Sequence, residues 1–195
     1  MSIKDFNHIQ KKLQNSLDYA RYEHTIGVMY TAGCLAMAHG YDIEKAMLTG
    51  LLHDCAKCMS HEERVKLCQE HKVEITQFEM ENLSLLHAKA GAILAKEEYN
   101  ITDLEVLHAI QVHTTGMPNM SVLDKIIYIA DYIEPSREQA PNLTYLRKIA
   151  YQDLDACIAQ ISCDTLCYLQ TKGNVIDPAT EQTYHFYEQY RKELD

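Results

Sequence analysis

The sequence predicts an all-α protein, and three observations support this prediction. Only seven glycines and four prolines occur in 195 residues, and the first proline is Pro118, so the strongest helix breaker is absent from the first 117 residues. Residues typical of helix starts recur along the chain. Between them, apolar residues follow a helical period, and we find no clear strand pattern.

Roughly nine helices are expected, joined by short connections. Capping-box spacing marks three of their starts, because Ser60, Thr76 and Thr102 are each followed by a glutamate three residues later. Asp177 and Pro178 suit the cap and the first position of the last helix. A break is expected within the longest segment, 142–171. The expected helices cover residues 3–15, 18–39, 42–57, 61–71, 77–98, 103–114, 121–133, 142–171 and 178–193.

The organisation of the chain predicts a single domain spanning residues 1–195. This length favours one domain and is sufficient to bury a real core. Apolar residues make up 47% and charged residues 24%, which are globular proportions and exclude disordered and collagen-like classes. We find no internal repeat, low-complexity tract or flexible linker that would divide the chain.

The charge of the chain argues against nucleic-acid and membrane partners. Basic residues number 18 and acidic residues 28, and the formal net charge of −10 repels phosphate backbones and anionic membranes. No apolar run approaches the roughly 18 residues of a membrane span, and the first residues lack the apolar stretch of a signal peptide. Seven cysteines, an odd number, indicate reduced thiols. We therefore expect a cytoplasmic protein.

Histidines are unusually frequent, and several of the ten lie on apolar helix faces. His87 and His113 each share an apolar stripe that should face the core, where a lone histidine is more often a hydrogen-bonded core residue than a ligand. His53 and Asp54 are neighbours at the end of a predicted helix and point about 100° apart, so both cannot face the same core. Both can reach one ion between helices, and imidazole and carboxylate are common metal ligands.

Asp131 is a second anomaly, because it lies in the almost wholly apolar run 126–133. Burying an unpaired carboxylate costs several kcal/mol or forces it to take a proton. An ion pair with Arg137 or Lys125 is one explanation for this aspartate. Metal ligation is the other, and it explains the placement better.

Cys55 and Cys58 form a C-x-x-C pair beside His53 and Asp54. Such a pair is found in zinc sites and in redox proteins. No second C-x-x-C pair follows in the sequence, and we find no strands of the kind that accompany a thioredoxin-like motif. We therefore favour the interpretation of these cysteines as core residues.

Histidines and aspartates on the predicted helices follow the order H, HD, H, H, D. They are His24, His53, Asp54, His87, His113 and Asp131. This order resembles the HD superfamily of metal-dependent phosphohydrolases over nearly the whole chain. Flanking strings narrow the resemblance to the YqeK family of bacterial symmetrical diadenosine tetraphosphate hydrolases. The strings are RYEHT at 21–25, LHDCAK at 52–57, HTTG at 113–116, LDKII at 123–127 and DYIEPSR at 131–137.

The resemblance implies an iron-binding enzyme that cuts diadenosine tetraphosphate, a small-molecule substrate, into two molecules of ADP with one or two divalent ions. It gives the core metal ligands as His24, His53, Asp54 and Asp131. It gives His87 and His113 as ligands of a second metal or of phosphate. It gives the substrate contacts as Arg21, Lys57 and Arg137, together with the late loop residues Lys172, Gly173, Asn174, Val175 and Ile176.

The chain departs from the family pattern after His87. There it reads Ala-Lys-Ala-Gly-Ala, where family members more often have a Gly-Pro pair, so the helix can begin or bend differently. This departure leaves the role of His87 and the presence of a second metal open.

The mechanism that we hypothesise uses metal-bound water, held by the four core ligands, as the catalytic group. As hydroxide it would attack an inner phosphorus while ADP leaves, and His87 or His113 would steady the phosphate oxygens. Another HD-class nucleotide phosphohydrolase (a nucleotidase, a dNTP-cleaving enzyme or a phosphodiesterase) and a non-catalytic nucleotide-sensing module stay open as alternatives, with an iron oxygenase more remote. The sequence also leaves open whether the chain forms a homodimer.

Overall fold

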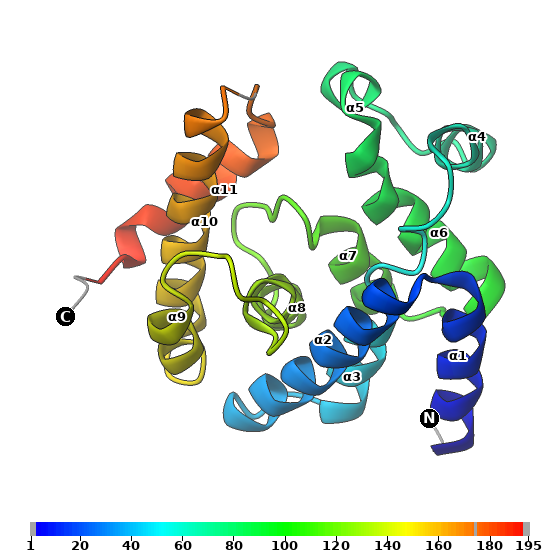
Figure 1. Ribbon diagram of the computed structural model, residues 1–195, viewed down its shortest axis with the longest axis horizontal. Coiled ribbons are helices and arrows are strands. Elements are labelled where there is room, and N and C mark those ends of the chain that lie inside the picture. Colours follow the sequence, from blue (N-terminus) through cyan, green and yellow to red (C-terminus); the bar gives the residue numbers. More distant parts are fainter. Residues whose placement is uncertain (1–2, 174, 193–195) are drawn as a thin grey trace.

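The computed structural model describes residues 3–173 and 175–192, and every regular element within these ranges is a helix (Figure 1). The prediction of an all-α fold is confirmed. The α-helices are α1 (Ile3–Ser16), α2 (Tyr19–Ala38), α3 (Ile43–Leu52), α4 (His61–Glu70), α5 (Gln77–Glu81), α6 (Leu86–Tyr99), α7 (Leu104–Val112), α8 (Val122–Ile133), α9 (Leu143–Ile149), α10 (Leu154–Thr171) and α11 (Pro178–Tyr187). Two short 3-10 helices accompany them, η1 (Leu83–Leu85) and η2 (Glu188–Tyr190).

The N-terminal caps show which start signals were right. Ser60 and Thr76 each form a capping box with the glutamate three residues later, as predicted. The box expected at Thr102 is wrong, because Asp103 is the cap and its carboxylate accepts the N–H of Glu105 at 2.9 Å. A carboxylate one residue later starts the helix one residue later, and the Glu105 side chain pairs with a lysine of α3 instead of reaching back.

The segment 77–98 is not the single helix that the sequence predicts. Helix α5 ends at Glu81, and Asn82 leaves the helical region with φ −130° and ψ 61°. The Asn82 side chain donates to the carbonyl of Phe78 at 3.0 Å, so it closes α5, and η1 then leads into α6. This interruption places a turn directly before His87.

Two other boundaries bear on the site. The helix expected over 42–57 ends at Leu52, and residues 53–58 form successive turns, so His53 and Asp54 lie in a turn. The break expected within 142–171 is confirmed between α9 and α10.

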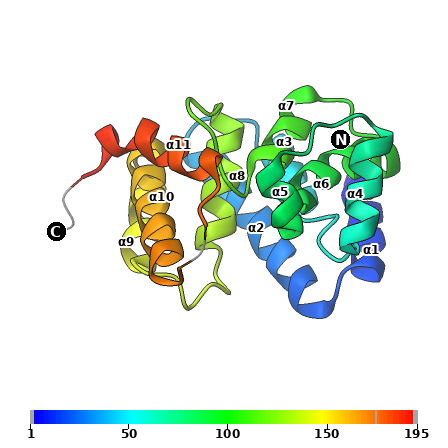
Figure 2. The ribbon, with the colours of Figure 1, turned by 90° about the horizontal axis from the view of Figure 1, so that it is seen from above.

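Helix α8 lies at the centre of the molecule. It packs against α2, α3 and α7 and also against α9 and α10. In two perpendicular views, α9, α10 and α11 lie on one side of α8, and the N-terminal helices lie on the other (Figures 1 and 2). No helix within the described ranges is long and apolar enough to cross a membrane.

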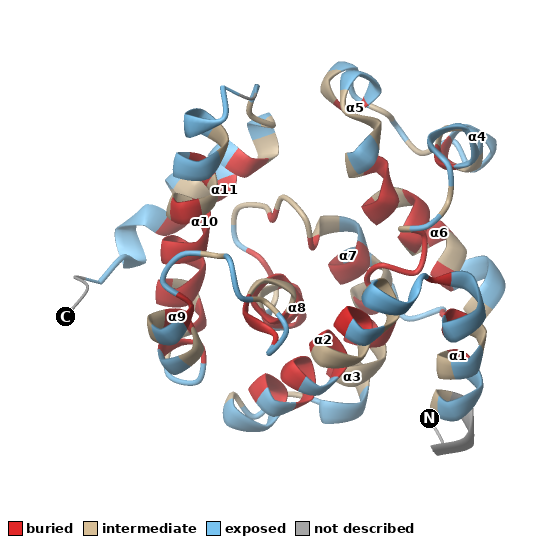
Figure 3. Ribbon diagram, viewed as in Figure 1, coloured by how far each residue is buried: buried red, intermediate tan, exposed pale blue. Residues whose placement is uncertain are grey.

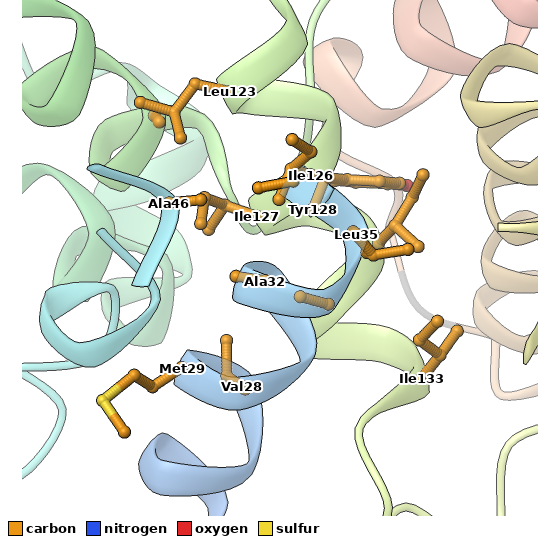
Figure 4. Close-up of a cluster of buried hydrophobic side chains, with 14 of the residues drawn as sticks. Val28, Met29, Ala32, Leu35, Ala46, Leu123, Ile126, Ile127, Tyr128 and Ile133 are labelled. Carbon is orange, nitrogen blue, oxygen red and sulfur yellow. The ribbon is translucent and has the colours of Figure 1, made fainter. Parts of the chain in front are cut away.

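Buried residues, coloured red in Figure 3, lie mainly where these helices pack against one another. One hydrophobic cluster extends from Ile9 in α1 to Tyr187 in α11. In its centre, Val28 of α2 and Ile127 of α8 are fully buried (Figure 4). Asp131 follows one turn later on α8, so its backbone belongs to a helix whose neighbouring residues are buried in the core.

Helices α2 and α3 approach each other closely at Gly50. A Cβ atom there would lie 3.1 Å from the Cα atom of Met29 and 3.1 Å from the carbonyl oxygen of Val28. Glycine permits this contact because it has no side chain. The close approach brings the end of α3 beside α2, and the ring centroids of His24 and His53 lie 5.4 Å apart.

Candidate metal centre

Three helices bring the four predicted core ligands together. His24 lies in the second turn of α2, His53 and Asp54 follow α3, and Asp131 lies in the last turn of α8. His24 Nε2 is 3.0 Å from Asp131 Oδ1, and His53 Nε2 is 3.9 Å from the same oxygen. His53 Nε2 is 3.6 Å from Asp54 Oδ2. The ligand atoms of His24, His53 and Asp131 all lie within 4.8 Å of one another, a spacing that suits one ion.

Backbone carbonyl groups set the ring orientation of three histidines. His53, His87 and His113 each direct Nδ1 toward the carbonyl oxygen of the residue three positions earlier, at 2.7 Å in every case. A carbonyl only accepts hydrogen bonds, so Nδ1 carries the proton and the neutral ring presents the lone pair of Nε2. This is the tautomer in which a histidine binds a metal through Nε2.

His24 reaches the same state through a side chain. Its Nδ1 lies 3.0 Å from Glu134 Oε1, and an ionised carboxylate only accepts. Burial by itself would lower the pKa of His24, but the carboxylates of Asp131 and Glu134 raise it above the ordinary value. Glu134 was not among the site residues predicted from the sequence. The available signal was a carboxylate directly after an apolar helix, within the string 131–137.

Three buried polar atoms in this region have no hydrogen-bond partner: Nε2 of His24, Nε2 of His53 and Oδ1 of Asp54. Buried polar atoms in proteins are nearly always hydrogen-bonded. With the proton on Nδ1, Nε2 of His24 is an acceptor 3.0 Å from a carboxylate oxygen of Asp131. Asp54 Oδ1 lies 3.2 Å from His87 Nε2, so a cation would stabilise this grouping of acceptors. Imidazole nitrogen with carboxylate oxygen is a donor set that suits iron and several other divalent ions, so these residues fit a metal.

A second cluster adjoins the first through Asp54. His87 Nε2 lies 3.2 Å from Asp54 Oδ1 and 3.2 Å from His113 Nε2. The Thr114 hydroxyl lies 3.1 Å from His87 Nε2 and 3.2 Å from His113 Nε2. The ligand atoms of His53, Asp54 and His113 form a second group within 4.8 Å. Thr114 was also not assigned from the sequence, although it directly follows His113.

The two predicted arginines contact the ligand carboxylates. Arg21 Nη1 lies 2.8 Å from Asp54 Oδ2, and Arg137 Nη2 lies 2.7 Å from Asp131 Oδ1. Arg137 is therefore the ion-pair partner considered for Asp131, whereas Lys125 pairs with an aspartate of α10 at 2.6 Å. Since Asp131 also faces two histidines, this ion pair does not account for the whole cluster.

The charge states in the cluster are those that bind a divalent cation. Burial lowers the pKa of His53 to about 4 and also lowers the pKa of His87. Burial would raise the pKa of Asp54 and Asp131, but the neighbouring histidines hold both below the ordinary value. Lys57 Nζ lies 2.9 Å from His87 Nε2 and 3.5 Å from Asp54 Oδ1, and burial lowers the pKa of this lysine.

The residues of the late loop, which the sequence predicts to contact nucleotide, lie in different surroundings. Lys172 caps the end of α10, and its Nζ lies 5.7 Å from the ring centroid of Tyr168. Gly173 has φ +68°, a conformation that favours glycine. Ile176 is partly buried, and Asn174 lies outside the described residues.

Val175 of the same loop lines a cavity of about 480 Å³ between α5 and the start of α11. Ser84 lines this cavity too, and its carbonyl oxygen is the partner of His87 Nδ1. A neighbouring cavity of about 240 Å³ shares Asp177 with the first and is lined by Thr114. The two cavities therefore lead from the late loop toward the second cluster.

The two cysteines of the C-x-x-C pair lie in different surroundings. Cys55 is buried, and its Sγ donates to the carbonyl of Gly91 at 3.4 Å. Cys58 is exposed and lies beside Asp18, with Sγ 3.6 Å from Oδ2. Neither belongs to the groups of ligand atoms described above.

Comparison with known proteins adds independent information. Residues 21–136 match the HD domain family. The symmetrical bis(5'-nucleosyl)-tetraphosphatase of Halalkalibacterium halodurans is 44% identical over 165 residues, covering 85% of this chain and 87% of that protein. The protein of the same name from Bacillus subtilis is 37% identical over 174 residues, covering 89% of this chain and 92% of that protein.

A solved structure agrees with these sequence relatives. It is a crystal structure from Clostridium acetobutylicum described as a "predicted HD superfamily hydrolase involved in NAD metabolism". The two chains are 41% identical and superpose with a TM-score of 0.91, over 95% of this chain and 98% of the other. On its sequence match, its relatives and its fold, the chain belongs to the HD domain family and, within it, to the symmetrical bis(5'-nucleosyl)-tetraphosphatase family.

Proposed function

We propose that this chain is a metal-dependent hydrolase that cuts diadenosine tetraphosphate symmetrically into two molecules of ADP. The observation that supports this most directly is the set of buried ligand atoms on His24, His53 and Asp54 that lack hydrogen-bond partners. They occur in a chain that is 37% and 44% identical to two relatives named symmetrical bis(5'-nucleosyl)-tetraphosphatase.

The proposed ligands of the first ion are His24, His53, Asp54 and Asp131, and iron is the ion that we favour. A divalent ion held there would lower the pKa of a coordinated water and polarise a phosphoryl oxygen. Three histidine rings and two carboxylates converge on the two adjoining ligand groups, which supports one ion or two.

The basic residues are proposed to neutralise substrate charge. In phosphoryl transfer, charge spreads over the phosphoryl oxygens, so fixed cations stabilise the transition state. Arg21 and Arg137 border the ion position, because each already contacts a ligand carboxylate. The Arg137 side chain is 42% exposed, so it can turn from Asp131 to a phosphate oxygen without disturbing the core.

The second cluster is proposed to hold phosphate oxygens or a second ion. Lys57 Nζ and the Thr114 hydroxyl both face His87 Nε2, at 2.9 and 3.1 Å. Both can donate hydrogen bonds to a phosphoryl oxygen that enters between them. His113 would complete this set from the end of α7.

One nucleoside is proposed to enter the cavity lined by Val175, Phe78 and Leu85, whose wall combines apolar and polar side chains. Nucleosides suit such a cavity because a base offers a flat apolar face and a polar edge. The loop residues Lys172, Gly173 and Ile176 are proposed to flank it, and Asn174, outside the described residues, stays a proposed substrate contact.

We further propose that residues 1–195 act as one domain in the cytoplasm, on a small-molecule substrate and without nucleic acid. The hydrophobic cluster that extends from α1 to α11 supports a single unit. All seven cysteines are free, which suits a reducing compartment.

The test is an anaerobic assay of iron-loaded protein with diadenosine tetraphosphate, with the nucleotide products separated by chromatography. We expect ADP as the only nucleotide product, because symmetrical cleavage divides the four phosphates equally. ATP together with AMP would contradict symmetrical cleavage. Turnover of nucleoside monophosphates, dNTPs or cyclic nucleotides in preference would favour another HD-class phosphohydrolase.

A matched pair of variants strengthens this assay. Asp54→Asn preserves the shape of the side chain but removes the charge that both clusters share, so we expect loss of bound iron and of ADP formation. His185→Ala removes a histidine whose side chain is 69% exposed and should leave both unchanged. Nucleotide binding without turnover by iron-loaded wild-type protein would favour the sensing module.

A further inference from the structure

We propose that Glu134 is a positioning residue, whose carboxylate fixes the His24 ring in the tautomer and orientation in which Nε2 binds the metal. This inference rests on the metal site of the proposed function. It assigns to Glu134 no contact with substrate, and it explains how the ring of the site histidine within α2 is held.

His24 differs from the other site histidines in the hydrogen-bond partner of its Nδ1 atom. His53 and His113 directly follow the ends of α3 and α7, and His87 is the second residue of α6. In each case Nδ1 reaches a carbonyl oxygen three residues earlier, near a helix end. His24 lies within α2, where the backbone carbonyl groups are used by the helix itself. Its Nδ1 instead meets Glu134 Oε1 at 3.0 Å, across 110 positions of the sequence.

Glu134 is itself held in one orientation. The residue is 1% exposed, its Oε2 accepts the backbone N–H of Ser136 at 2.7 Å, and its Oε1 accepts the Ser136 hydroxyl. The carboxylate therefore accepts three hydrogen bonds, one of which comes from His24. Such a group cannot rotate without leaving a buried donor unpaired.

The surface of α2 is shaped to receive this carboxylate. Gly27 lies one helical turn after His24, and a Cβ atom at this position would come within 2.5 Å of Glu134 Oε2. Glycine inside a helix is unfavourable relative to alanine. Its presence at this position is explained by the space that the Glu134 side chain occupies.

A purely structural role for the Glu134 side chain would be to hold the turn that leads to Arg137. Backbone and arginine contacts already hold that turn. The N–H of Arg137 donates to the carbonyl of Glu134 at 3.0 Å, and Arg147 donates to the carbonyl groups of Glu134 and Arg137 at 2.9 and 2.8 Å. The side chain of Glu134 is thus left for His24 and Ser136.

The test measures Fe²⁺ affinity anaerobically by equilibrium dialysis, together with urea unfolding of the metal-free protein. In Glu134→Gln, the amide oxygen can accept the N–H of Ser136 only if the NH₂ group faces His24 Nδ1. The NH₂ group then donates to Nδ1, which favours the tautomer with the proton on Nε2, where the metal should bind. We expect Fe²⁺ affinity to fall about tenfold to a hundredfold. Glu134→Asp keeps an acceptor but shortens the side chain, so its affinity should lie between those of wild type and Glu134→Gln.

A second pair of variants tests the same inference without changing any polar atom. Gly27→Ala should displace the Glu134 carboxylate and weaken Fe²⁺ binding by about tenfold. Gly33→Ala lies on the same helix, but its Cβ would meet the flexible Met47 side chain, at 2.8 Å, and should bind Fe²⁺ as wild type does.

The inference is overturned if Glu134→Gln binds Fe²⁺ as tightly as wild type, or if Gly27→Ala cannot be distinguished from Gly33→Ala. A lower unfolding free energy with unchanged affinity would assign Glu134 a structural role only. Turnover of diadenosine tetraphosphate by the wild-type protein is measured separately. Tight Fe²⁺ binding without that turnover would contradict the proposed substrate and would not concern Glu134.

Discussion

The two halves of the centre satisfy their ligand atoms in different ways. In the first cluster, formed by His24, His53 and Asp131, the Nε2 atoms of both histidines are buried and have no hydrogen-bond partner. In the second cluster, which adjoins the first through Asp54, the Nε2 atoms of His87 and His113 face Lys57 or Thr114. The first cluster is therefore arranged for an added cation, whereas the protein supplies an ammonium group and a hydroxyl group to the second.

The two clusters also differ in the helices that carry their side chains. His24 and Asp131 lie on α2 and α8, which both contribute buried residues to the main hydrophobic cluster. His87 and His113 are held by a turn before α6 and by the end of α7, beside the cavities. The first cluster is therefore held partly from within two helices, and the second by residues near a turn and at a helix end.

The greatest loss of turnover is expected for a variant of the first cluster, and metal content should distinguish the two clusters. His53→Ala removes a ligand atom of the first ion, and losing metal catalysis of about 4 kcal/mol corresponds to about a thousandfold lower turnover. His113→Ala should retain the first ion and lose about tenfold to a hundredfold. Metal analysis and initial rates of ADP formation measure both effects. If the two variants lost metal equally, the clusters would be one site.

The next effect concerns the stability of the metal-free protein. The pKa of His53 is lowered to about 4 in the folded state, whereas an unfolded histidine titrates near 6.5. Since the unfolded chain binds the proton first, stability falls as the pH falls from about 6.5 to about 4, by up to about 3 kcal/mol for this group. Asp54 and Asp131 have lowered pKa values, so their contributions are lost only below about pH 4.

Urea unfolding with a chelator present, at several values between pH 7.5 and pH 4.5, measures this dependence. His53→Asn should remove the part of this loss of stability that His53 contributes, and His87→Asn should also reduce it, because burial lowers the pKa of His87 as well. Equal slopes in wild type and His53→Asn would show that His53 is not a buried neutral group.

Much of this molecule was accessible from the sequence because its signals are local. The capping boxes at Ser60 and Thr76 depend on residues three positions apart, and both are confirmed. The interruption at Asn82 was missed, because it depends on a side chain closing α5 and on the contacts of the turn before His87. Propensity alone favours continuing such a helix.

The same distinction between local signals and long-range contacts applies to the site residues. The positions of His53, Asp54 and Asp131 stood out as polar residues in apolar segments, a pattern visible in the sequence. Glu134 offered a weaker signal, a carboxylate directly after an apolar helix, and its role depends on Nδ1 of a histidine 110 residues earlier in the chain. Long-range contacts of this kind follow from packing, and no periodicity in the sequence encodes them.

Lys57 provides a test of why the second cluster differs from the first. Lys57→Met removes the ammonium group that faces Asp54 and His87, so the second cluster becomes free to bind a second Fe²⁺ ion. We expect more bound iron per chain but turnover lower by about tenfold to a hundredfold, since a cation that stabilises phosphoryl charge is lost. Lys66→Met, at a lysine that is 76% exposed, is the control. Unchanged iron content would show that Lys57 does not restrict the second cluster.

The smallest expected effect belongs to Thr114. Thr114→Val keeps the shape of the side chain but removes the hydroxyl that lies 3.1 and 3.2 Å from the two Nε2 atoms of the second cluster. A neutral hydrogen bond contributes about 1 kcal/mol, so turnover should fall about fivefold while iron content stays at the wild-type value. Thr115→Val, whose hydroxyl donates to a backbone carbonyl, serves as the control. A loss of iron in Thr114→Val would instead mean that the two clusters depend on each other, because a hydroxyl of the second would then be needed to hold the ion of the first.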